Sequence, residues 1–171
     1  MPNELNETTI LDNQTLNFGT SEDFKIAYDT GDNRLEIRDT SDAVIAHLST
    51  AGALTVAGAL TGSDDVVVSK LLKLTPTTAT IASGAITVTS SYMIIDTEGA
   101  AATDDLDTIN GGEDGARLIL VSANSARDVV VKNNTGNIRC GADFTLNTTS
   151  DTIELIFRAG SGWKKISSAS N

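Results

Sequence analysis

The sequence predicts an all-β protein, and three observations lead to this class. Short apolar segments alternate with polar residues at a period of two, clusters of Gly, Asn, Asp, Ser and Thr separate them, and no window keeps helical spacing. The pattern is clearest over residues 115–167, in the segments ARLILV, DVVVK, NIRC, FTL, TIELIF and WKKIS. Aromatic residues make up only 4% of the chain, so we expect an aliphatic core.

The first fifteen residues predict an extended arm. They are polar except for the apolar pair Ile10 and Leu11, which cannot form a core of their own. We therefore expect residues 1–15 to be an anchoring arm that a partner or a neighbouring subunit orders. The opening residues lack the basic and apolar regions of a secretory signal, and no apolar run is long enough to span a membrane. Synthesis in the cytoplasm is the expectation.

Residues 16–62 predict a small β-meander followed by a shaft-like strand. Phe24, Ile26 and Tyr28 alternate with polar or small neighbours, residues 29–33 supply turn chemistry, and alternation resumes over residues 34–38. A third strand follows over residues 44–48. The apolar face of so small a sheet must be covered by something, because a few strands alone are marginally stable.

A direct repeat of the sequence AGALT occupies residues 51–55 and 57–61. Leu54, Val56 and Leu60 fall on one face of the predicted strand, and the remaining side chains are small. Three copies around an axis bury these side chains against each other, and Gly permits the close backbone approach. The sequence leaves open an ordinary glycine-containing strand within a monomer.

The Ser-Asp-Asp break at residues 63–65 is the predicted boundary to a second module, residues 63–171, expected to be an antiparallel β-sandwich or jelly-roll-like domain. Residues 66–74 fit a strand, although SKLLKL also fits a short helix that ends before Pro76. The Gly-, Ala- and Asp-rich residues 97–115 fit a long loop and outward contact surface. A Gly-Ser-Gly turn precedes Trp163, which predicts a final hairpin. Trp163 is then either a cap on the core or an interface anchor.

Composition and motifs argue against enzymatic chemistry, metals and cofactors. The net charge of −11 disfavours nucleic acids and anionic membranes as partners. His47 and Cys140 are the only residues of their types, so triads and multi-histidine metal sites lack parts. The acidic segment at Asp105 and Asp107 starts like a calcium loop, but Ile109 stands where a third ligand is required.

The order SEDFKIAYDTGDNRLEIRDTSDAVIAHL followed by GALTVAGALTG resembles the repeated modules of tailed-bacteriophage fibres and virion appendages. The second half resembles the small β-domains of fibre ends and capsid decoration proteins. There Gly112 and residues 115–120 match a domain-opening pattern of glycines and leucines, and Trp163 with Ile166 matches a final W-x-x-I-S strand.

This resemblance implies a non-enzymatic homotrimer located in the virion and made in the host cytoplasm. The short chain favours a capsid decoration protein or a short head fibre, with Leu54, Val56 and Leu60 at the three-fold axis. Its expected partners are copies of itself and the major capsid protein or another virion component, which residues 1–15 contact. The alternative is a tail-fibre or adhesin module that recognises a host surface carbohydrate through residues 97–115.

Overall fold

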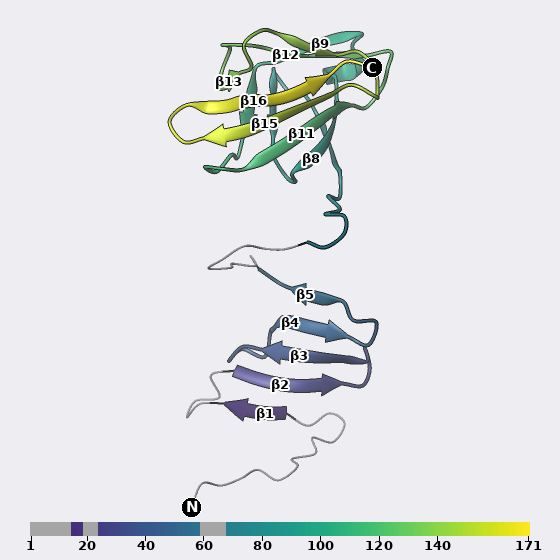
Figure 1. The fold of residues 1–171 in the computed structure, drawn as a ribbon, viewed down its shortest axis with the longest axis vertical. Coiled ribbons are helices and arrows are strands. Elements are labelled where there is room, and N and C mark those ends of the chain that lie inside the picture. Colours follow the sequence, from purple (N-terminus) through teal and green to yellow (C-terminus); the bar gives the residue numbers. More distant parts are fainter. Residues whose placement is uncertain (1–14, 19–23, 59–67) are drawn as a thin grey trace, which may run out of the picture. The chain divides into compact units, whose positions relative to one another are not determined.

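The computed structural model describes residues 15–18, 24–58 and 68–171. The chain divides into two compact units, Met1–Val67 and Val68–Asn171 (Figure 1). The predicted boundary between residues 62 and 63 lies outside the described residues. Within them the chain forms strands, turns and one short 3-10 helix, η1 (Glu98–Ala100), which confirms the all-β class.

The first unit is a single antiparallel sheet whose five strands follow one another in chain order. Figure 1 shows them stacked side by side. The strands are β1 (Thr15–Phe18), β2 (Phe24–Asp29), β3 (Arg34–Arg38), β4 (Val44–Ser49) and β5 (Leu54–Val56). β2 to β4 are the predicted meander, and β5 is the predicted shaft strand.

The turn between β2 and β3 has the chemistry that the sequence indicated. The Asp29 Oδ1 atom accepts a hydrogen bond from the backbone N–H of Gly31 at 2.8 Å. Asn33 lies in the left-handed region, with φ of 51°, which asparagine tolerates better than most residues. The turn sets the register in which Tyr28 faces Leu35.

The second unit contains eleven strands among the described residues. They are β6 (Thr77–Thr80), β7 (Ala85–Thr87), β8 (Tyr92–Asp96), β9 (Thr103–Leu106), β10 (Thr108–Asn110), β11 (Arg117–Ser122), β12 (Asp128–Val131), β13 (Ile138–Arg139), β14 (Phe144–Leu146), β15 (Thr152–Arg158) and β16 (Gly162–Ala169). They form a six-stranded sheet in the order β13-β16-β15-β11-β8-β6, a three-stranded sheet β14-β12-β9 and a two-stranded sheet β10-β7.

The expectation of a purely antiparallel second module is wrong. Five of its strand pairs are parallel, namely β6–β8, β8–β11, β9–β12, β7–β10 and β13–β16. The chain passes repeatedly between the sheets, which gives a solenoid-like arrangement, and the pairs β11–β15, β12–β14 and β15–β16 are antiparallel. Alternation has the same period in parallel and antiparallel strands, so the pattern carried no information about direction.

One aliphatic core lies between the three sheets of the second unit, as the low aromatic content led us to expect. Side chains from all three sheets belong to it, and most of them are fully buried. The six-stranded sheet contributes Met93, Ile95, Leu118, Leu120, Ile138, Ile153, Leu155 and Trp163, the three-stranded sheet Leu106, Val129, Val131 and Leu146, and the two-stranded sheet Ile86 and Ile109. The final hairpin is β15–β16, as predicted.

Two further expectations for the second unit are wrong. Residues 68–74 form no strand, and Leu71 is 91% exposed there. Residues 97–115 are not a loop, because they contain η1, β9 and β10, and Leu106 and Ile109 are fully buried. The many glycines and aspartates of this segment are typical of loops, so the sequence did not indicate that Leu106 and Ile109 are core residues.

Candidate functional site

The first candidate site is the apolar face of the first unit's sheet. Cross-strand partners share a face of a sheet, and two rows of apolar partners run across β2 to β5. The rows are Ile26–Ile37–Ala46–Val56 and Tyr28–Leu35–Leu48–Leu54. Leu54 is 64% exposed, and Leu35, Leu48, Ile37 and Val56 are also exposed. A continuous apolar face of this kind is a candidate interaction surface.

The opposite face of the same sheet is polar and carries its own counter-charges. Glu36 is fully buried between Arg34 and Arg38. Its carboxylate accepts hydrogen bonds from Arg34 Nε at 2.7 Å and Arg38 Nε at 2.6 Å. Asp42 is within 3.4 Å of both Arg38 and Lys25. The hydrogen bond to Glu36 raises the pKa of Arg34.

The sequence located part of the apolar face. Leu54 and Val56 lie on it, at its β5 end, whereas Leu60 lies outside the described residues. The anchoring pair Ile10 and Leu11 also lies outside the described residues. Sequence reasoning did not place Ile37, Leu35 and Leu48 on the same face as the predicted trimer residues, although the alternation in β3 and β4 indicates it.

The histidine and the cysteine, the side chains most often used in catalysis or metal binding, occupy structural positions. His47 is half-buried on the polar face, opposite Thr55 and Glu36. Cys140 is buried, which raises the pKa of its thiol and disfavours the reactive thiolate. No cluster of three or more His, Cys, Asp or Glu side chains within the described ranges is suited to a metal ion.

Trp163 belongs to the core of the second unit. Its side chain is fully buried, and its indole Nε1 donates a hydrogen bond to the Ile109 carbonyl at 3.0 Å. The rings of Phe157 and Trp163 make a T-shaped contact, with their centroids 5.3 Å apart. Ile166, the other residue of the final strand pattern, is 47% exposed. Trp163 thus ties the last hairpin to β10.

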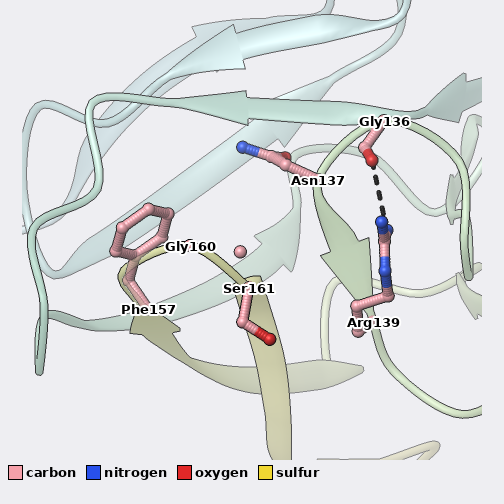
Figure 2. Close-up of a pocket in the computed structure, with 7 residues that line it drawn as sticks. Gly136, Asn137, Arg139, Phe157, Gly160 and Ser161 are labelled. Carbon is pink, nitrogen blue, oxygen red and sulfur yellow. Dashed lines mark hydrogen bonds between the residues drawn. The ribbon is translucent and has the colours of Figure 1, made fainter.

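The second candidate site is a cavity of about 480 Å³ beside the β15–β16 turn. Figure 2 shows Phe157 on one side of it, Arg139 on the other and Ser161 between them. The Asn137 side chain is held by two hydrogen bonds to the Ile109 backbone, at 2.9 and 2.8 Å. The rest of the lining is glycine: Gly136, Gly160 and Gly162.

Two glycines make the cavity rim possible. A Cβ atom at Gly162 would lie 2.0 Å from the Asn137 carbonyl oxygen, and one at Gly136 would lie 2.3 Å from the Asp107 carbonyl oxygen. Both residues also have positive φ. The rim therefore depends on backbones that approach each other more closely than any side chain allows.

No protein-family model matches the chain, and no curated protein matches it either. No helix within the described residues is long and apolar enough to cross a membrane.

Proposed function

We propose that this protein is a non-enzymatic structural component of a tailed-phage particle, a homotrimeric capsid decoration protein or short head fibre. The apolar face of the first unit is the observation that carries the trimer. The resemblance of residues 16–171 to fibre and decoration modules supports the placement on a virion.

A second copy of the chain is the partner that best suits the apolar face. The two apolar rows carry no charged side chain, so identical faces meet without repulsion. The opposite face buries the Glu36 carboxylate between two arginines, and its other charged side chains lie in water. This asymmetry turns the apolar rows inward in any assembly.

The choice of three copies rests on the AGALT repeat and on the resemblance, because the face itself is small. Strands of about five residues, rising ~3.3 Å per residue and spaced ~4.8 Å apart, give the four-strand face roughly 300 Å². Three such faces bury roughly 900 Å² in total, which is less than a standard specific interface, so the rest of the chain adds contacts in the proposed trimer. Leu54, Val56 and Leu60 would lie near the axis.

The second unit serves as a rigid body in this proposal. Its six- and three-stranded sheets pack across a shared core in a sandwich-like manner, and its last hairpin is tied down by Trp163. Residues 1–15, with Ile10 and Leu11, would contact the major capsid protein or another virion component. Three arms on one trimer bind several subunits at once, so that modest contacts combine.

A matched pair of variants tests the trimer. Leu54→Asp places a charge on the apolar face, and Thr55→Asp places the same charge one residue along β5, on the opposite face. Sedimentation velocity should give the single-chain mass for Leu54→Asp and the trimer mass for Thr55→Asp. Equal behaviour of the two variants would contradict the assignment of the face.

Imaging of phage particles tests the placement. Antibody-labelled or difference imaging of particles with and without this chain should show three-fold clusters on the head shell. Density only at the tail tip would overturn the decoration proposal and favour the tail-fibre alternative. Removal of residues 2–15 should abolish attachment to particles while leaving the isolated trimer intact.

A further inference from the structure

Arg139 differs from every other arginine of the described chain. The other five, Arg34, Arg38, Arg117, Arg127 and Arg158, each pair with a carboxylate. Arg139 has no carboxylate within ion-pair distance among the described residues, and neither does Lys164, its cross-strand partner in the β13–β16 pair. In a chain with a net charge of −11, two adjacent cations without a counter-charge are unexpected.

The guanidinium of Arg139 is nevertheless held in place. Its Nη1 atom donates to the carbonyl oxygens of Ile138 at 2.8 Å and Gly136 at 3.1 Å. Its Nε and Nη2 donors make no hydrogen bond to the described residues. Arginine presents its donors as a planar fork that matches a carboxylate, so the remaining donors suit an anionic oxygen pair.

The other side of the cavity offers an apolar surface and a hydroxyl. Phe157 makes a T-shaped contact with Trp163. It also packs against Gly112, where its ring leaves no space for a Cβ atom. The Ser161 side chain is exposed and makes no hydrogen bond to the described residues. The cavity volume of about 480 Å³ falls within the range of small-molecule sites.

We propose that this cavity binds an acidic sugar of the uronic acid type. The Arg139 fork binds the sugar carboxylate, the Phe157 ring packs against the C–H face of the pyranose, and the Ser161 hydroxyl bonds to a ring hydroxyl (Figure 2). Arg139 is the charged residue that lines the cavity, and no carboxylate is among its lining residues. This site is independent of the trimer interface and goes beyond a purely structural role.

Saturation-transfer difference NMR of the full chain with methyl glucuronide tests the site. A single sugar with one ion pair should bind with a Kd on the order of 1 mM. The neutral methyl glucoside, which differs only at the carboxylate, should bind at least ~10-fold more weakly, because it leaves the Arg139 donors without a partner. Equal binding of the two sugars, or no saturable signal from the glucuronide, would overturn the proposal.

Variants assign the binding to this cavity. Arg139→Gln should weaken glucuronide binding by at least ~10-fold. Arg158→Gln, an exposed arginine outside the cavity lining, should leave it unchanged. Ser161→Ala should weaken binding by about 3-fold, and it removes only a hydroxyl from an exposed turn, so it tests the site even if Arg139→Gln disturbs the β13 backbone. Full binding by both Arg139→Gln and Ser161→Ala would refute the site.

Discussion

At the scale of single residues, Glu36 determines which face of the first sheet can remain in water. A carboxylate with no exposed surface is stable only when it is paired, and here two arginines on the same strand provide the pairs. The sequence contains the pattern Arg-x-Glu-x-Arg, but alternation alone does not reveal that the central carboxylate is buried. Burial follows from the stems of the two arginines lying on either side of it.

Removal of this carboxylate should destabilise the first unit. Glu36→Ala leaves Arg34 and Arg38 close together without a counter-charge, and we expect the free energy of unfolding to fall by about 2 kcal/mol, since both arginines are a quarter exposed. Chemical denaturation at constant protein concentration measures the change. The control Asp32→Asn breaks an exposed pair with Arg34 and should cost less than about 0.5 kcal/mol. Equal costs would contradict this account.

Asp151 plays a comparable part in the second unit. The fully buried carboxylate accepts hydrogen bonds from the backbone N–H groups of Asn147, Thr148 and Asn171, which ties the last residue of the chain to the loop before β15. These bonds, the one from Asn171 foremost, lower the pKa of Asp151.

The lowered pKa predicts a pH dependence. A carboxyl whose folded pKa lies below its unfolded value of about 3.9 stabilises the fold fully above that value, and the stabilisation is lost as the pH falls through the folded pKa. The wild-type chain should therefore lose more stability between pH 6 and pH 3 than Asp151→Asn does. Glu113→Gln, at an exposed position, should keep the wild-type pH profile. Identical profiles for wild type and Asp151→Asn would exclude the mechanism.

At the scale of elements, the sequence predicted more about the first unit than about the second. The β2–β3 hairpin and the β15–β16 hairpin were predictable because a short turn between alternating segments permits only antiparallel pairing. The parallel pairs, such as β8 with β11, join segments far apart in the chain, and neither turn chemistry nor alternation reports on them. The cavity near Arg139 was unpredictable for the same reason, since it forms where β13 meets β16.

The junction of β13 and β16 should be intolerant of side chains. Gly162→Ala would bring a methyl group into the Asn137 carbonyl at a positive φ, whereas a Cβ atom at Gly160, also at positive φ, meets nothing within 4 Å. We expect about 1 kcal/mol of destabilisation for Gly160→Ala from backbone strain alone. Gly162→Ala should cost at least twice as much in denaturant unfolding. A similar cost for both would mean that the close approach is not rigid.

At the scale of the whole molecule, the two units have opposite relations to their apolar side chains. The second unit encloses a core of its own, with Trp163 fully buried. The first unit has no second layer among the described residues, and its larger apolar side chains stay exposed on one face. The sequence indicated this imbalance, because a meander without a covering element requires a partner.

The mass of the isolated full-length protein tests the central claim most directly. Multi-angle light scattering on a sizing column should give three times the single-chain mass of 17.8 kDa. A value equal to one chain, maintained as the concentration is raised, would show that the apolar face of the first unit does not join copies of this protein, and the trimer would have to be abandoned.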